Sequence, residues 1–218
     1  MASKPATVHP GDIFACWGTG WISRGISLET SLLSWITGPN GLRWAPSHVA
    51  IAARRAVGGD CCWFESTTLA GGLPCLEAGE TVSGVQVHGV ASRIDDYCRA
   101  GGSVVQYRLT DIDKLDLQED EHLRAILMKH CGRNGIAPVG YDAAGAMFSG
   151  LRVVPWLPFA RANLETVFCS ELIAAVLQRL GRMNRSNPAR FNPGRLLRRL
   201  VQQGTYRRVC RYDNRGAA

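Results

Sequence analysis

The chain has 218 residues, of which 46% are hydrophobic, and its formal net charge is +7 at pH 7. This length and composition suit one folded domain over residues 1–218, with a core from about residue 9 to 212. No run approaches the roughly 18 apolar residues that a membrane-spanning helix needs, so a transmembrane segment is not expected.

The N-terminal residues and the cysteines indicate in which cell compartment the protein is expected. The first ten residues contain one lysine and no apolar stretch, so they do not resemble a secretory signal. Eight cysteines are present without a C-x-x-C pair, and in a chain of this kind they favour reduced thiols over a disulfide framework. We therefore expect a cytoplasmic protein, with later release by another route left open.

Positive charge is concentrated at the C-terminal end. Residues 179–218 hold eleven arginines and one acidic residue, Asp213, so this segment has a surplus of ten positive charges. Such a segment is suited to face phosphate in nucleic acid or in lipid head groups. Because aromatic residues are sparse there and no nucleic-acid motif is visible, we favour a solvated arginine-rich surface around a C-terminal helix and strand.

Hydrophobic periodicity predicts the secondary structure in chain order. Strands are expected within 11–17 after a turn, and at 47–53, 61–67, 82–90, 103–109 and 205–212. Helices are expected at 21–37, from Ser92 to Arg99, from Asp116 or Glu119 to about Arg133, from Cys169 to Leu180, and from Asn192-Pro193 to about Gln203. Glycine-rich residues 69–81 and apolar residues 138–163 read as irregular. Strands in the middle with helices at both ends predict the α+β class.

Cys169 begins a regular helical pattern. Apolar residues recur after it at intervals of three and four, and Gly181 follows as a stop signal. The first turn of a helix has unpaired backbone N–H groups and the positive end of the helix dipole, which favour a negative charge such as a thiolate. Most free cysteines are small buried hydrophobes, so Cys169 is a candidate nucleophile that still needs a base.

His48 is the candidate for that base. On a strand over 47–53 it shares a face with Ala50 and Ala52, two small residues that leave room beside the imidazole ring. The other four histidines lie in the N-terminal arm, on a strand without an evident acidic partner, or on a helix: His9, His88, His122 and His130.

Glu65 is the candidate to orient the histidine. Its strand, 61–67, follows the His48 strand after a short turn, so the two are expected to form a hairpin. If His48 lies directly opposite Glu65, the turn centres between Ala56 and Val57, and the carboxylate can accept a hydrogen bond from the ring. This contact would fix the tautomer and stabilise the imidazolium, although an exposed strand glutamate is the plainer interpretation of Glu65 alone.

Several short motifs, taken in order, carry a family resemblance. They are Gly-Asp-Ile-Phe near the start, Ser-His-Val-Ala-Ile on one strand, Phe-Glu-Ser on the next, Gly-Tyr-Asp, Phe-Cys-Ser-Glu-Leu-Ile on a helix, and Asn-Pro-Gly-Arg-Leu. This succession, over residues 11–197, resembles the circularly permuted NlpC/P60 group, and most of all the YiiX/YebB-type papain-like cysteine hydrolases. Histidine precedes cysteine, the reverse of papain, which a permutation explains because geometry defines such a site.

The resemblance implies a fold and a set of roles. The fold would be a circularly permuted papain-like (NlpC/P60) α+β fold, with an antiparallel sheet packed against the helix that bears the cysteine. The family's nucleophile falls on Cys169, its general base on His48 and its third polar residue on Glu65. Tyr141 matches a tyrosine near the oxyanion site, and a half-buried capping tyrosine is an equal alternative. The arginine-rich C-terminus and the apolar 150–160 segment depart from simpler members and leave the substrate open.

The expected function is hydrolysis of an amide bond, in a peptide, an isopeptide or a cell-wall stem peptide, through a thioester acyl-enzyme. A lipid-directed thiol acyltransferase or phospholipase is one alternative, since related permuted folds include lipid acyltransferases. Trp156, Leu157, Phe159 and the basic C-terminus could address a lipid surface. A non-enzymatic module that binds a partner or nucleic acid through the arginine-rich C-terminus is the other alternative.

No metal or organic cofactor is expected. Cys61, Cys62, Cys75 and His88 carry atoms that can bind zinc, but adjacent cysteines do not match the usual ligand spacing. The expected partner is a peptide, peptidoglycan or lipid-linked acyl substrate, with contact to an anionic surface through the C-terminal arginines. The oligomeric state is left open.

Overall fold

The computed structural model describes residues 6–19, 45–68, 72–131, 138–140, 168–214 and 216–217. The helix expected at 21–37, most of the apolar segment 138–163 and Tyr141 lie outside these described residues. The expectations for those three segments therefore stay predictions.

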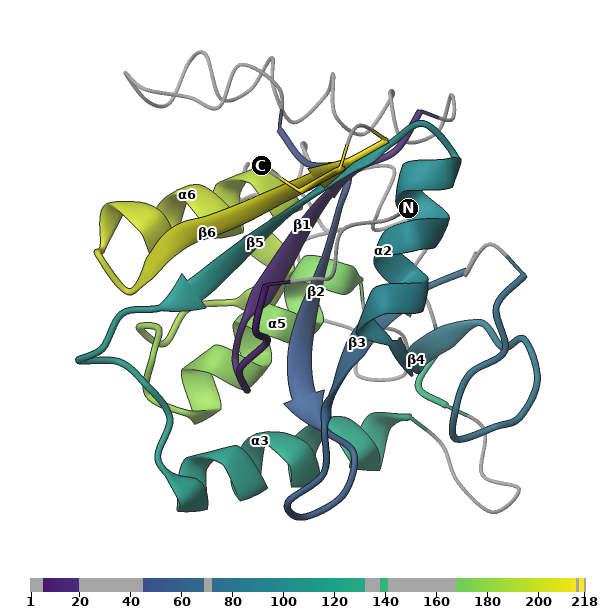
Figure 1. Cartoon of the computed structure of the whole chain (residues 1–218). Coiled ribbons are helices and arrows are strands. Elements are labelled where there is room, and N and C mark those ends of the chain that lie inside the picture. Colours follow the sequence, from purple (N-terminus) through teal and green to yellow (C-terminus); the bar gives the residue numbers. More distant parts are fainter. Residues whose placement is uncertain are drawn as a thin grey trace.

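An antiparallel sheet forms the centre of the described structure (Figure 1). Its order is β4-β3-β2-β1-β5-β6-β7, so β1 lies between the next strand of the chain, β2, and the much later β5. The strands predicted from periodicity are confirmed, and the two-residue β7 is an addition. Their bounds are β1 Ile13–Trp17, β2 His48–Arg54, β3 Cys61–Thr67, β4 Gly84–Gly89, β5 Ser103–Leu109, β6 Tyr206–Asp213 and β7 Gly216–Ala217.

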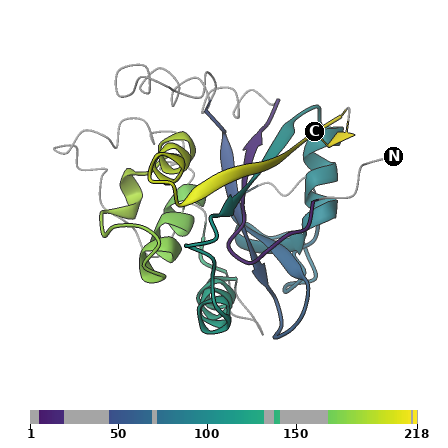
Figure 2. The ribbon, with the colours of Figure 1, turned by 60° about the vertical axis from the view of Figure 1, so that its left-hand side comes forward.

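Helices cover both faces of this sheet (Figure 2). Helix α2 (Val90–Arg99) lies on one face, and α3 (Leu117–His130), α5 (Cys169–Arg179) and α6 (Pro193–Gln202) lie on the other. A short 3-10 helix, η3 (Pro188–Arg190), precedes α6. The arrangement is α+β, as the sequence predicts. No helix in the described ranges is long and apolar enough to cross a membrane.

Local sequence explains where two of the helices, α3 and α6, begin. Asp116 caps α3, since its side chain accepts from the Glu119 N–H at 2.8 Å while the Glu119 carboxylate accepts from the Asp116 N–H at 3.0 Å. Asn192 caps α6 ahead of Pro193, and its side chain accepts from the Arg195 N–H at 2.7 Å. Two boundaries differ from the prediction: α2 begins at Val90 rather than at Ser92, and α3 ends at His130 rather than near residue 133. Gly89, not the serine, is the residue before the α2 start.

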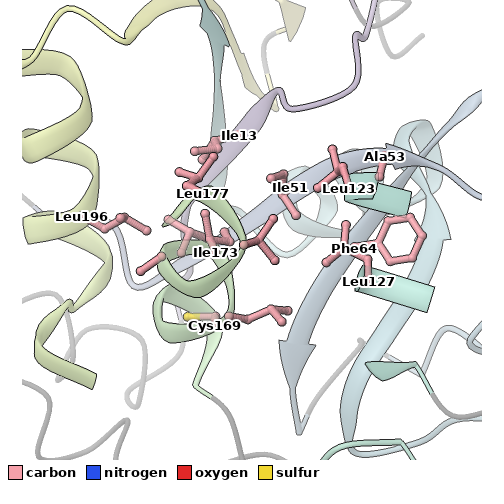
Figure 3. Packing of buried hydrophobic residues seen from close by; sticks show 14 of the residues in the cluster. Ile13, Ile51, Ala53, Phe64, Leu123, Leu127, Cys169, Ile173, Leu177 and Leu196 are labelled. Atoms are coloured by element: carbon pink, nitrogen blue, oxygen red, sulfur yellow. The ribbon is translucent and has the colours of Figure 1, made fainter. Parts of the chain in front are cut away.

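Alternation along the strands divides their side chains between two apolar clusters. The larger cluster joins Val49, Ile51 and Phe64 of the sheet to α3, α5 and α6 (Figure 3). The smaller cluster lies under α2 and includes Ala50, Ala52 and Trp63. Val49 and Ile51 thus face the opposite side of the sheet from Ala50 and Ala52, as the sequence predicts.

The arginine-rich C-terminal segment is part of this packing. In α6 the apolar residues Leu196, Leu197 and Leu200 are buried, while Arg195 and Arg199 are exposed. Strand β6 pairs with β5 along its length and exposes arginines on its outer side. The segment therefore supplies a helix and a strand to the folded core rather than a separate tail.

Candidate active site

The β2–β3 hairpin determines how His48 and Glu65 meet. The strands pair Ile51 with Phe64 and Arg54 with Cys61, so Glu65 lies across from residue 50 and not across from His48. The predicted register was wrong by two residues. The turn instead centres next to Gly58, whose φ of 71° suits a tight turn that other residues rarely adopt.

A shift of two residues leaves the side chains on the same face, because the side-chain period of a strand is two. His48 and Glu65 are therefore diagonal neighbours, which long side chains can bridge. The imidazole Nε2 and the carboxylate Oε2 are 2.6 Å apart. His48 is 8% exposed and Glu65 only 1% exposed, so the contact is shielded from water.

Cys169 is the first residue of α5, and its side chain is buried (Figure 3). Phe168 precedes the helix in an extended conformation and has no side-chain acceptor for the first backbone N–H groups of α5. The Ser170 hydroxyl donates to the carbonyl of Phe191, which ties the start of α5 to the segment before α6. The cysteine is held where the helix dipole favours negative charge on sulfur.

His48 connects the cysteine to the glutamate. Burial disfavours the charged ring, but the neighbouring Cys169 sulfur and the Glu65 carboxylate outweigh burial and raise the pKa of His48 to about 9. The ring therefore carries a proton at neutral pH when the thiol is ionised. This arrangement can hold a thiolate and an imidazolium side by side, which is the reactive form of a cysteine nucleophile.

Glu65 is held ionised despite its burial. Desolvation alone would raise its pKa, but the charge of Arg93 and the contacts with His48 and Arg93 lower the pKa of Glu65 to about 2. Arg93, from α2, donates from Nε to Glu65 Oε1 at 2.6 Å. The carboxylate thus has one oxygen on each partner.

Sequence reasoning missed the contribution of α2. Arg93 is 2% exposed, and the Tyr97 ring lies over the His48 ring with centroids 6.4 Å apart and planes at 19°. Cys16 of β1 lies directly across from His48 and is fully buried. The α2 segment reads as an ordinary short amphipathic helix, and nothing in its pattern indicates that an arginine turns inward.

Comparisons with known proteins give a distant likeness to a solved structure. No family model matches the chain, and no curated protein matches its sequence. Among solved structures it is similar to the metalloprotein YiiX from Escherichia coli O157:H7, with 15% identity and a TM-score of 0.49. The similarity covers 85% of this chain and 79% of that chain. At this distance it transfers no residue's role.

Two other polar residues, His88 and Asp12, have partners that the sequence does not predict. His88 was predicted to lack an acidic partner, but its Nε2 is 3.8 Å from Glu65 Oε1, while its Nδ1 lies 3.2 Å from the Pro74 carbonyl oxygen. Asp12, directly before β1, is 1% exposed and accepts from Gln106 and Arg108. Within the described ranges, no group of three or more potential ligands is placed to hold a metal ion.

Proposed function

We propose that the protein is a cysteine hydrolase with a circularly permuted papain-like (NlpC/P60) core, in which Cys169, His48 and Glu65 form the catalytic triad. The observation that carries the proposal is the buried contact of 2.6 Å between His48 and Glu65, made by a ring whose pKa the neighbouring Cys169 sulfur also raises. Strongly shifted pKa values with a specific charge partner are typical of functional sites. The order of histidine strand before cysteine helix supports the permuted arrangement.

In the proposed reaction Cys169 is the thiolate and His48 carries the proton. Sulfur attacks the carbonyl carbon of an amide, and His48 gives its proton to the leaving amine as the C–N bond breaks. The neutral ring then takes a proton from water, whose oxygen attacks the thioester. The acid product leaves, and the thiolate and the imidazolium are restored.

Backbone N–H groups at the start of α5 are the proposed donors to the oxyanion. The first N–H groups of a helix have no intrahelical acceptor, and the N-cap residue Phe168 supplies none from its side chain. The helix dipole adds to their effect. Glu171 has a different part, since its carboxylate accepts from the Phe168 N–H at 3.4 Å and so fixes the entry into the helix.

Substrate turnover tests the proposal. Purified peptidoglycan fragments and a mixture of fluorogenic peptide amides are incubated with wild-type protein and with Cys169→Ala. We expect hydrolysis that falls by several orders of magnitude in the variant, because members of a catalytic unit act together. Equal turnover by both proteins would refute the assignment. Phosphatidylcholine vesicles serve as the ester arm, where release of fatty acid without amide cleavage would favour the lipid alternative.

A further inference from the structure

The Glu65 carboxylate has a second partner that the proposed triad does not include. Its Oε2 faces His48, while its Oε1 accepts from Arg93 Nε at 2.6 Å. The other end of the Arg93 guanidinium donates to Asp96 Oδ2 at 2.5 Å. Arg93 is thus held between two carboxylates, and the Arg93 side chain is only 3% exposed.

Tyr97 links the same helix to the histidine. The Arg93 guanidinium lies 4.7 Å from the centroid of the Tyr97 ring, which in turn lies over the His48 ring. Arg93 and Tyr97 are four residues apart in α2, so they share one face of the helix. One face of α2 therefore contacts both the acid and the base of the site.

We propose that Arg93 is a positioning residue of this site, whose guanidinium keeps Glu65 ionised and turned toward His48, so that the imidazole is poised to hold the proton of Cys169. This inference rests on the proposed function. It adds a fourth group, supplied by the helix on the opposite face of the sheet from α5. Arg93 touches no reacting atom and acts through Glu65.

The case for Arg93 comes from the groups around the carboxylate. Facing it are His48 from β2, His88 from β4, and Arg93 with its neighbours Asp96 and Tyr97 from α2. The charge of Glu65 also acts on the Cys16 thiol, and the Cys169 sulfur acts on His48. Burial lowers the pKa of His88, so this ring supplies no lasting positive charge. Burial raises the pKa of Tyr97, which stays neutral.

Arg93 is therefore the permanent positive charge beside Glu65 within the described structure. Burial opposes its charge, but the neighbouring Glu65 carboxylate raises the pKa of Arg93 further, so it remains protonated. A buried carboxylate without such a partner takes up a proton instead. A protonated Glu65 would no longer stabilise the imidazolium of His48.

The test is the pH dependence of Cys169 alkylation by iodoacetamide, followed by mass spectrometry of the Cys169 peptide. In Arg93→Met we expect the midpoint of this profile to rise by about one pH unit or more. The rate near pH 7 should be at least tenfold lower, since a rise of one pH unit lowers the thiolate fraction about tenfold below the midpoint. Arg93→Lys should shift the midpoint less, because the ammonium keeps the positive charge, although it cannot contact Glu65 and Asp96 at once as the guanidinium does.

Matched variants separate positioning from a general loss of structure. Arg182→Met removes a comparable ion pair, 2.7 Å from Glu119 on the other face, and should leave the midpoint unchanged. In a double-mutant cycle, adding Arg93→Met to Glu65→Gln should have little further effect. If Arg93→Met does not fold, the lysine variant and the Glu65→Gln cycle built on it carry the test.

Each outcome decides a different claim. An unchanged midpoint in folded Arg93→Met, or fully additive effects in the cycle, would overturn the role of Arg93 and leave the proposed function standing. Failure of wild-type Cys169 to react at all would instead refute the proposed function, and the role of Arg93 with it.

Discussion

At the scale of single residues, the site depends on a diagonal contact that the sequence predicts only in part. Alternation along 47–53 correctly indicates that His48 and Glu65 can share a face. It cannot give the register, because the turn at Gly58 sets that register through a backbone angle and not through apolar pattern. Arg93 was missed because burial of a charged side chain depends on a carboxylate that folding brings to it.

The buried pair makes stability depend on pH in a defined window. The pKa of Glu65 lies near 2 when folded, below its ordinary value of 4.5. Its contribution to the free energy of unfolding is therefore complete above pH 4.5 and is lost as the pH falls toward 2. The pKa of His48 lies near 9, above 6.5, so its contribution is complete below 6.5 and is lost as pH rises through 9. Both contributions are complete between about 4.5 and 6.5.

Glu65→Gln tests this window. Urea unfolding as a function of pH should show a smaller free energy of unfolding for the variant between pH 5 and 7, with the difference shrinking toward pH 2. Glu121→Gln, at an exposed position of α3, is the control and should follow the wild type at every pH. A constant difference across the whole range would contradict the pKa values that the geometry implies.

At the scale of elements, sequence patterns predict that a helix or strand is present better than they predict where it begins and ends. The start of α3 follows from the reciprocal hydrogen bonds of Asp116 and Glu119, and the three-residue spacing of these residues predicts such bonds. The α2 start does not, because Ser92 lies inside the helix and the chain enters it from β4 at Gly89. The helix expected at 21–37 stays a prediction.

Gly84 shows how one element is positioned by a backbone contact. It begins β4 with φ at 117°, and an added Cβ would lie 2.2 Å from the Val139 carbonyl oxygen. Gly84→Ala should therefore lower the free energy of unfolding by about 2–5 kcal/mol, combining backbone strain with overpacking.

Gly79→Ala is the matched control for Gly84→Ala. Gly79 also has a positive φ, 74°, but no atom lies within 4 Å of an added Cβ, so it measures backbone strain alone. Denaturant titration of both variants makes the comparison. Equal losses would show that the contact with Val139 adds nothing.

At the scale of the whole molecule, the sheet order is beyond what periodicity can give. β1 lies between β2 and β5, and β6 from the end of the chain extends the same sheet, so the core joins segments far apart in sequence. The family resemblance, not the pattern of apolar residues, suggested an antiparallel sheet against the Cys169 helix. The helix and the strand expected at the arginine-rich end are confirmed as α6 and β6.

Exposed arginines lie along β6, next to an edge of the sheet. β7 pairs only with Tyr212 and Asp213, so within the described structure the outer side of 207–211 has no neighbouring strand. Charged side chains on such an edge oppose pairing with another chain. Arg207→Val with Arg208→Val should therefore cause concentration-dependent association, measured by light scattering against the wild type.

The corresponding double lysine variant, Arg207→Lys with Arg208→Lys, keeps the charge and should scatter light as the wild type does. If the lysine variant also associates, the positive charge at the edge is not what keeps the wild type from associating. Unchanged behaviour of the valine variant would show that some other part of the chain covers this edge.

The most direct measurement of the central claim is selective reaction of Cys169 among eight thiols with a mild electrophile near pH 7. Peptide mass spectrometry should find label on Cys169 first, because in the proposed triad the imidazolium of His48 stabilises its thiolate, whereas burial raises the pKa of the Cys16 and Cys131 thiols. His48→Ala should abolish this preference. Uniform labelling of several cysteines, or undiminished labelling of Cys169 in His48→Ala, would contradict the account.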